Sequence, residues 1–255
     1  MDYQSVHQQI IKQIKKYFAD AGFKKAVIGV SGGIDSALAL KLTVDALGSE
    51  NVTGIMLPET GVTKGINTSH AKALCDFLDV KTFIIPINKM LMEFAVTPWR
   101  PNPCSQMNLR SRIRMITLYN FANANAALVI GTSNKTEILL GYGTKHGDFA
   151  ADIEVLGDLY KTEVFELAEH IGLPPEIIEK TPTAELYNGQ TDEGELGASY
   201  PELDTILKKR DLGAMGMIEK GMNPALVSTI LARVEQNKHK TIPAYVIEIK
   251  HEEGS

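Results

Sequence analysis

Cysteine, long apolar runs and excess positive charge are all scarce in this chain of 255 residues. Its two cysteines, Cys75 and Cys104, lie far apart and form no CxxC pair or zinc spacing, which argues against a disulfide framework and predicts a reducing, cytoplasmic location. No apolar run approaches the roughly 18 residues of a membrane span, and the N-terminal segment does not resemble a signal peptide. A net charge of −5 leaves no basic footprint for nucleic acid.

What the chain does have is an alternation of short apolar strands and amphipathic helices. The strands are predicted at 25–30, 51–58, 81–87 and 126–132, and helices at 5–20, 35–47, 67–80, 105–125, 161–174 and 223–237. This order predicts an α/β fold, a Rossmann-like doubly wound parallel sheet with C-terminal helices. Residues 88–105 and 187–202 are predicted to be loops, and residues 1–255 a single domain.

The segment GVSGGIDS, residues 29–36, joins the first strand to the first crossover helix. Glycines after a buried strand let backbone amides approach a phosphate closely, and the following helix N-terminus favours an anion. Asp35 would repel phosphates unless a Mg2+ ion lay between them, and Mg2+ is commonly held by one or two carboxylates and phosphate oxygens. The alternative is a tight turn in which Asp35 only caps the helix.

The SGGIDS segment resembles the SGGxDS loop of the ATP pyrophosphatases, which cleave ATP between the α and β phosphates. The resemblance implies an adenine nucleotide alpha hydrolase-like fold. A second set of motifs narrows the choice within that superfamily. LVIGTSNKTE (128–137), TKHGDFAAD (144–152), KTPTAEL (180–186) and HKTIPA (239–244) resemble, in order, the conserved blocks of NAD synthetases.

This second resemblance implies an ammonia-dependent ligase that converts deamido-NAD to NAD with ATP and Mg2+, acting as a homodimer without nucleic-acid or membrane partners. It implies catalytic roles for Asp35, Asp148 and Lys161, and Mg2+ ligands at Asp35 and Glu137. The implied ATP-binding residues are Gly29, Val30, Ser31, Gly32, Gly33, Ile34, Asp35, Ser36, Thr132, Lys161 and Thr183. The implied deamido-NAD-binding residues are Arg112, Lys145, Asp152, His239 and Lys240. The length leaves no room for a glutaminase domain, although a separate glutaminase partner is compatible with the sequence.

Two rival functions stay open on the sequence. One is another enzyme of the superfamily, such as a tRNA thiolase or a lysidine-type ligase; paired cysteines and a basic RNA-binding surface would favour it, and the sequence shows neither. The other is a nucleotide sensor without turnover, against which the joint presence of Asp35, Glu137, Asp148 and Lys161 argues.

Overall fold

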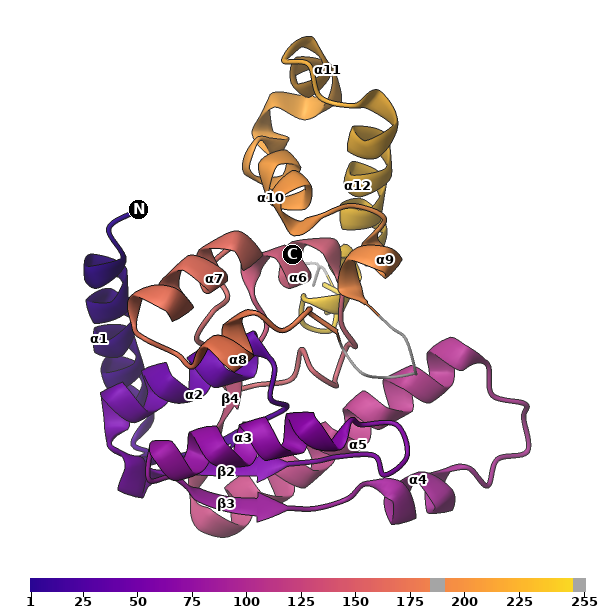
Figure 1. The fold of residues 1–255 in the computed structure, drawn as a ribbon. Coiled ribbons are helices and arrows are strands. Elements are labelled where there is room, and N and C mark those ends of the chain that lie inside the picture. Colours follow the sequence, from indigo (N-terminus) through magenta and orange to yellow (C-terminus); the bar gives the residue numbers. More distant parts are fainter. Residues whose placement is uncertain (184–190, 250–255) are drawn as a thin grey trace, which may run out of the picture.

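Five parallel strands form the centre of the molecule in a computed structural model that describes residues 1–183 and 191–249 (Figure 1). The strands are β1 (Lys25–Gly29), β2 (Val52–Met56), β3 (Lys81–Ile84), β4 (Ala127–Gly131) and β5 (Ile153–Glu154). Their order is β3-β2-β1-β4-β5, and every neighbouring pair is parallel. The predicted doubly wound α/β fold is therefore confirmed. Because the order reverses between β1 and β4, a crevice is expected at the carboxyl ends of those two strands.

Helices cover both faces of this sheet. The larger helices of the N-terminal part are α1 (Tyr3–Ala21), α2 (Ile34–Leu47), α3 (Gly65–Phe77), α4 (Asn88–Phe94), α5 (Pro103–Asn125), α6 (Lys135–Leu140) and α7 (Lys161–His170). Successive residues of a strand point to opposite faces of the sheet, so they belong to two different apolar cores. Ala26 and Ile28 pack with α1, α2, α3 and α7, whereas Val27 packs with α4 and α5. Such two-sided burial explains why the strands are apolar almost throughout.

The C-terminal helices form a second lobe, which stands above the sheet layer in Figure 1. It contains α9 (Asp192–Leu196), α10 (Tyr200–Lys208), α11 (Gly213–Glu219) and α12 (Pro224–Asn237), preceded by the short α8 (Pro175–Ile178). Single 3-10 turns lie at η1 (Ser49–Asn51), η2 (Arg210–Leu212) and η3 (Lys238–Lys240). The lobe has its own apolar cluster, which also takes in Leu140 of α6. That the chain folds as one domain stays a prediction, which this shared packing supports.

Several local predictions were wrong. Residues 88–94 are helical, although the segment was expected to be a loop, and Met92 and Phe94 stay exposed there. The short β5 was missed because two residues carry no periodic signal. Part of the expected 187–202 loop lies outside the described residues, and the rest contains α9 and the start of α10. Among the described residues, no helix is long and apolar enough to cross a membrane.

Candidate active site

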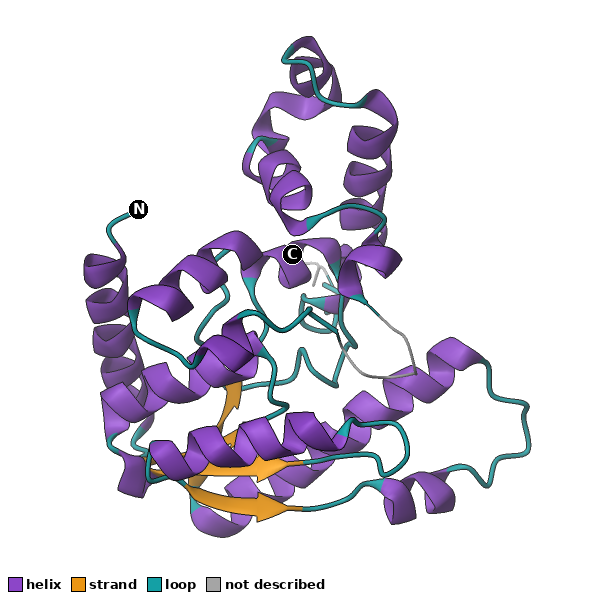
Figure 2. Cartoon of the chain, in the orientation of Figure 1, coloured by secondary structure: helices purple, strands orange, loops and turns teal. Residues whose placement is uncertain are grey.

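The turn after β1 is shaped by its glycines and serines. Gly32 has φ +77°, and a side chain there would collide with the backbone carbonyl of Asn67 at the start of α3. Only glycine fits that position without strain. The hydroxyl of Ser36 donates to Gly33 O at 3.0 Å and accepts from Ser31 N at 3.2 Å, so the turn is closed on itself. The first amides of α2 are thereby aimed at the carboxyl edge of the sheet, where teal loops gather in Figure 2.

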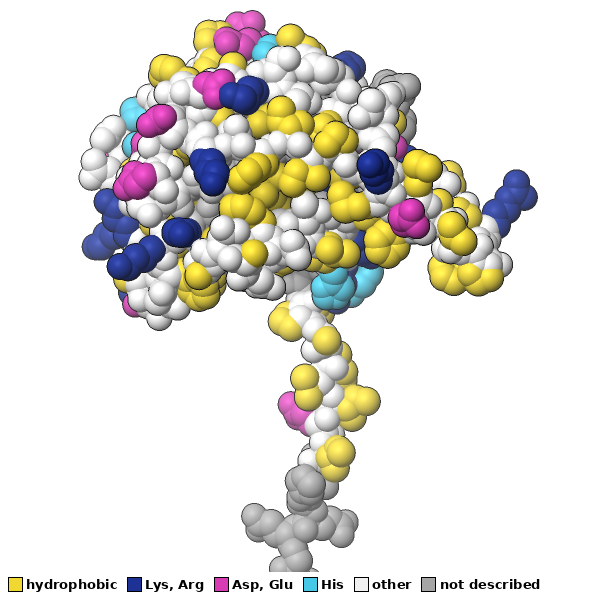
Figure 3. Space-filling model, turned by 90° about the horizontal axis from the view of Figure 1, so that it is seen from below, with side chains coloured by type: hydrophobic (Ala, Val, Ile, Leu, Met, Phe, Trp, Pro, Cys, Tyr) yellow, Lys and Arg dark blue, Asp and Glu magenta, His cyan; other side chains and the backbone are white. Residues whose placement is uncertain are grey.

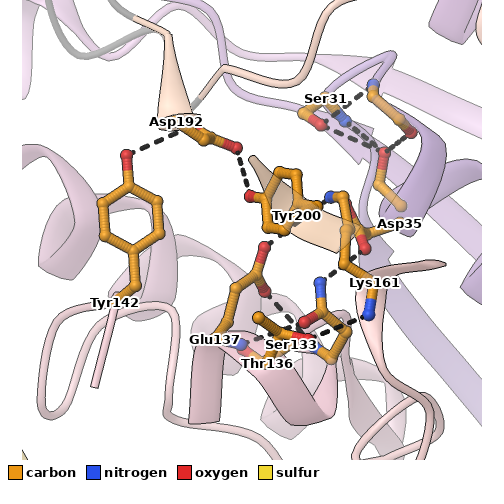
Figure 4. Close-up of polar contacts among 12 residues, drawn as sticks. Ser31, Asp35, Ser133, Thr136, Glu137, Tyr142, Lys161, Asp192 and Tyr200 are labelled. Carbon is orange, nitrogen blue, oxygen red and sulfur yellow. Dashed lines mark hydrogen bonds and ion pairs between the residues drawn. The ribbon is translucent and has the colours of Figure 1, made fainter. Parts of the chain in front are cut away.

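Asp35 is not a helix cap, which removes the alternative interpretation of this turn. The N-cap of α2 is Gly33, and Asp35 is the second residue of the helix. Its carboxylate accepts a hydrogen bond from Asn134 Nδ2 at 2.9 Å and forms an ion pair with Lys161. Asn134 follows β4, and Lys161 begins α7. Three segments far apart in the sequence therefore meet at one carboxylate, as Figure 4 shows.

Glu137 is the second carboxylate of this cluster. Asn134 and Glu137 form a capping box, in which Asn134 Oδ1 accepts from Glu137 N at 3.0 Å and Glu137 Oε2 accepts from Asn134 N at 3.2 Å. Glu137 Oε1 lies 3.8 Å from Lys161 Nζ. Burial, and then the charge of Asp35, raise the pKa of Glu137 well above its usual range, against the opposing effect of Lys161. The sequence NKTE carries this capping-box signal, which could have located the helix start.

Lys161 is almost fully buried, with 1% of its surface exposed. Burial works to lower the pKa of this amine, but the carboxylates of Asp35, Glu137 and Asp192 outweigh it, and the net direction is upward. The side chain is therefore a buried cation held among acids. Burial of this kind is unusual for lysine outside functional or tightly paired sites.

The Asp35 and Glu137 pair has the chemistry of a Mg2+ site. Both carboxylates lie beside one positive charge, the Lys161 ammonium, so the site already accommodates a cation between two oxygen donors. Among the described residues, no three His, Cys, Asp or Glu side chains gather as a closed metal cluster. A site with two protein carboxylates suits Mg2+, which usually takes its remaining ligands from water and phosphate.

A cavity of about 530 Å³ opens at this edge of the sheet. The cavity is within the size range of small-molecule sites. It is lined by predicted ATP-binding residues from four segments, namely Gly29, Val30, Ser31, Gly33, Ile34, Asp35, Ser36, Thr132, Lys161 and Thr183. Lys180 was missed by the sequence reasoning; it also lines the cavity, and its Nζ donates to Gly32 O at 3.2 Å. Its position just before the PTAEL block was the available signal.

Asp148 lies in the same cavity, at some remove from the lysine cluster. Its carboxylate accepts from the Ser111 hydroxyl and, at 2.8 Å, from Thr144 N, while Ser111 Oγ accepts from Asp148 N at 2.8 Å. Asp148 is exposed, whereas Ser111 and Thr144 are buried. A fixed carboxylate that still reaches solvent is suited to bind a small cation such as ammonium.

Glu154, which the sequence analysis did not single out, lies behind the cavity wall as a half-buried residue with a buried carboxyl oxygen. Its Oε2 accepts from Ser133 N at 3.0 Å, while Oε1 is buried without a hydrogen-bond partner in the described chain. Any side chain on Gly131 would overlap this carboxyl group, which explains the glycine that ends β4. Burial is the main cause that raises the pKa of Glu154 to about 8. The group is therefore largely neutral at pH 7.

This buried carboxyl group predicts a pH-dependent stability. An unfolded chain ionises Glu154 near pH 4.5, whereas the native state resists ionisation until about pH 8. The free energy of unfolding therefore falls as the pH rises through that window, by roughly 3–5 kcal/mol from this group. Glu154→Gln should remove most of that decline. Urea denaturation at pH 5 and pH 8.5 measures it, with the exposed Glu176→Gln as control. An equal decline in the wild type and Glu154→Gln would contradict the assignment.

Most residues predicted to hold deamido-NAD gather beyond Asp148. Arg112 donates to Lys145 O at 3.3 Å, and Lys145 Nζ donates to His239 O at 2.7 Å. Lys240 lines the cavity and donates to Gly141 O at 2.8 Å. Burial, and then the charge of Arg233, lower the pKa of Lys240. The C-terminal turn thus lies beside Gly141, which is 99 residues earlier in the chain than Lys240.

Asp152 is placed differently from the other predicted substrate residues. Its Oδ2 accepts from Val129 N at 2.7 Å, and its Oδ1 accepts from the Tyr119 hydroxyl at 3.3 Å. Burial, and then the charge of Asp152, raise the pKa of Tyr119 to about 12. The residues described as lining the cavity do not include Asp152. A structural role at the edge of β4 is visible, and a role in substrate binding stays a prediction.

The fold and this site together define an α/β enzyme of the ATP pyrophosphatase type, with a glycine-rich turn at the switch point of a parallel sheet. Comparison with known proteins narrows the class. Residues 6–244 match the family model described as NAD synthase, and the chain belongs to that family. It is 43% identical over 248 residues to the NH(3)-dependent NAD(+) synthetase of Methanocaldococcus jannaschii, covering 94% of this chain and 95% of that relative. The corresponding protein of Methanosarcina acetivorans is 41% identical over 246 residues, with 94% and 96% covered.

Solved structures agree with this assignment. The NH3-dependent NAD synthetase from Campylobacter jejuni, in complex with the nitrate ion, superposes with a TM-score of 0.84 at 32% identity, covering 97% of this chain and 100% of that one. An NMN synthetase from Francisella tularensis superposes with a TM-score of 0.87 at 30% identity, covering 98% and 100%. Two different product names therefore occur among structures of this shape.

Proposed function

We propose that this protein is a ligase that amidates deamido-NAD to NAD with ammonia and ATP, the last step of NAD biosynthesis. The observation that carries the proposal is the meeting of Asp35, Glu137 and Lys161 at the carboxyl ends of β1 and β4, directly after the glycine-rich turn. Family membership and identities above 40% to curated NH(3)-dependent NAD(+) synthetases support the substrate and the nitrogen source.

The reaction has two chemical steps. In the first, an oxygen of the substrate carboxylate attacks the α-phosphorus of ATP, an acyl-adenylate forms, and pyrophosphate leaves. In the second, ammonia attacks the activated carbonyl carbon, AMP leaves, and the amide remains. Adenylation is needed because a carboxylate is a poor electrophile at neutral pH.

The residues of this chain divide between those steps. The amides after β1, with the Ser31 and Ser36 hydroxyls, hold the phosphates, and Thr132 and Thr183 contact ATP from the opposite side. Lys161 stabilises negative charge that builds on the phosphates during transfer. Asp35 and Glu137 would hold Mg2+, which supplies further neutralisation of that charge when bound.

Asp148 serves the second step. Ammonia is mostly ammonium at neutral pH, so the nucleophile must be bound and then lose a proton. A carboxylate fixed by Ser111 and Thr144 supplies a counter-charge and a proton acceptor at a set position. Beyond it, the basic residues proposed to bind the dinucleotide substrate are Arg112, Lys145, His239 and Lys240, with Asp152 proposed as the acidic member.

A direct assay of both products tests the function. The purified protein is incubated with MgATP, ammonium and deamido-NAD, and NAD and AMP are quantified. We expect equal amounts of both products. Nicotinic acid mononucleotide is assayed in parallel, because its amidation would give the product named for the NMN synthetase of similar structure. Faster amidation of the mononucleotide would move the proposal to that substrate, and absence of any nucleotide turnover would favour a sensor.

We also propose that the protein acts as a homodimer in the cytoplasm. Figure 3 shows hydrophobic side chains gathered on one face of the molecule. The exposed hydrophobic residues include Phe83 and Ile84 of β3 and Ile116 of α5, and β3 meets α5 where the Phe83 ring lies 5.8 Å from that of Phe121. This supports α5 as an interface element. Helix α12 has less support as an interface element, because it turns Val227 and Ile230 inward to its own cluster.

Sedimentation velocity tests the dimer. We expect the wild type to sediment as a dimer at micromolar concentration, and Ile116→Glu to shift the population towards monomer because a charge would be desolvated at the interface. Ile66→Glu is the control, since Ile66 is similarly exposed but lies on α3. A monomeric wild type, or equal effects of the two substitutions, would count against α5 as the interface.

A further inference from the structure

One face of α10 holds the start of α7, where Lys161 lies. Tyr200, Asp204 and Lys208 recur every four residues and therefore project from the same side of their helix. Asp204 Oδ2 accepts from Thr162 N at 2.9 Å, and Lys208 Nζ lies 2.7 Å from Glu163 Oε1. The first turn of α7 is thus secured from the C-terminal lobe.

Tyr200 makes the contact to the lysine side chain itself. Lys161 Nζ lies 5.2 Å from the centre of the Tyr200 ring, within the range of a cation–π interaction. The ring is 3% exposed, so this contact is made away from water. Its hydroxyl donates to Asp192 Oδ2 at 2.9 Å. A hydrogen bond from the hydroxyl to a carboxylate fixes the plane of the ring beneath the amine.

Asp192 joins this arrangement to the sheet layer. It is the first residue of α9 and is 5% exposed, and it shares the Tyr142 hydroxyl, at 3.1 Å, with Glu195, at 2.7 Å (Figure 4). Tyr142 follows α6, the helix that carries Glu137. Through the Tyr200 ring, the Asp192 carboxylate therefore reaches the lysine from outside the pair of proposed metal ligands.

The Asp192 carboxylate matters because Asp35 and Glu137 are also the proposed ligands of a metal ion. When Asp35 and Glu137 ligate a cation, as the proposed function requires, their charge is no longer available to Lys161. Asp192 and the Tyr200 ring keep their places, since their partners belong to α9, α10 and the end of α6. A buried ammonium without any counter-charge would be strongly destabilised.

We propose that Asp192 and Tyr200 are positioning residues that hold Lys161 where it meets the transferring phosphates. The proposal rests on the proposed function, and it assigns to the C-terminal lobe a part in the adenylation step. Neither residue needs to touch the reacting atoms, because both act through the lysine.

Tyr200→Phe is the first test, because it keeps the ring and removes only the bond to Asp192. We expect ATP–pyrophosphate exchange in the presence of deamido-NAD to fall about tenfold in kcat, the usual scale for one hydrogen bond to a charged group. The KM for deamido-NAD should stay within about twofold of wild type, since Tyr200 contacts Lys161 and not the residues predicted to bind deamido-NAD. Tyr3→Phe is the matched control: its hydroxyl also bonds a carboxylate on α7, Glu166, but on the exposed side.

A double-mutant cycle separates positioning from general support of the fold. If Tyr200 acts through the lysine, Tyr200→Phe should cause no further loss in a Lys161→Met background. Calorimetric binding of MgATP gives a second readout where exchange becomes too slow to measure, and the same non-additivity is expected there. Multiplicative losses in both readouts, or an unaffected kcat in Tyr200→Phe, would overturn the proposal.

Two further observations keep the outcomes distinct. Unfolding curves show whether each variant is folded. Asp192→Asn keeps the shape of the side chain, removes its charge and replaces one of its two accepting oxygens with a donor, and it should reproduce the loss. Wild-type protein that forms no NAD would contradict the proposed function. Wild-type turnover with Tyr200→Phe and Asp192→Asn equal to wild type would contradict the positioning role alone.

Discussion

Asp35→Asn should reduce NAD formation by about a thousandfold or more at saturating MgATP, while the protein remains folded. The substitution keeps the oxygen that accepts from Asn134 Nδ2 but removes the negative charge beside Lys161. The transition state carries negative charge on the phosphates, and it would lose both a proposed Mg2+ ligand and the balance of charge around Lys161. Steady-state kinetics across Mg2+ concentrations measure the effect. Glu137→Gln should behave in the same way, because its carboxylate is the other donor.

The cost to stability of Asp35→Asn should be small by comparison. Glu137 remains 3.8 Å from Lys161, and loss of the Asp35 charge relieves repulsion between the two acids. We expect a decrease of about 1–3 kcal/mol in the free energy of unfolding. Asp158→Asn is the control, since it breaks an Asp–Lys pair, with Lys135, in which the aspartate is almost fully exposed. Near-normal, Mg2+-dependent turnover in both Asp35→Asn and Glu137→Gln would refute the metal assignment.

Asp148→Asn should divide the two steps of the reaction. The rate of adenylation, measured by ATP–pyrophosphate exchange, should stay within about threefold of wild type. The rate of NAD formation at limiting ammonium should fall about a hundredfold, which is the scale of a lost general base. The reason is that the amide neither attracts ammonium nor accepts its proton. The KM for ammonium should rise as well. Rates measured from pH 7 to pH 9.5 should partly recover at high pH, where free ammonia is more abundant.

The geometry around Asp148 makes this variant interpretable. An amide oxygen can still accept from Thr144 N, and the Ser111 hydroxyl can rotate to accept from the new amide nitrogen. The local loop should therefore keep its conformation, which an unchanged unfolding midpoint would show. Equal losses in exchange and in NAD formation would place Asp148 in substrate binding or adenylation. An unchanged rate at every ammonium concentration would remove it from the mechanism.

Much of the core of this site was accessible from the sequence because its parts follow strands. The segments SGGIDS and GTSN each come directly after an apolar run, and parallel strands place such tips at one edge of the sheet. Asp35, Thr132 and Glu137 were identified in this way together with the resemblance to NAD synthetases. The boundaries of β1 and β4 were also predicted to within a residue at each end. Local pattern and parallel topology were sufficient for these features.

The remainder of the site depends on segments that approach only when the chain is folded. Nothing in the spacing of Asp192, Tyr200 and Tyr142 indicates that they meet near Lys161, since each lies in a different element. No pattern in the sequence marks Glu154 either. Its raised pKa comes from burial behind Gly131, and burial is a property of the packed molecule. Likewise, Asp152 fits the family motif, yet its carboxylate is bonded to the edge of β4.

The sequence by itself determined the parallel α/β sheet, the glycine-rich turn after β1 and the types of residue available at the site, because strand periodicity, glycine and helix N-termini act over a few neighbouring residues. The tertiary structure alone decided which acids surround Lys161, which of them are buried, and how the C-terminal lobe reaches the site. Those properties depend on desolvation and on charges from distant segments, and both arise only when α7, α9 and α10 pack against the sheet.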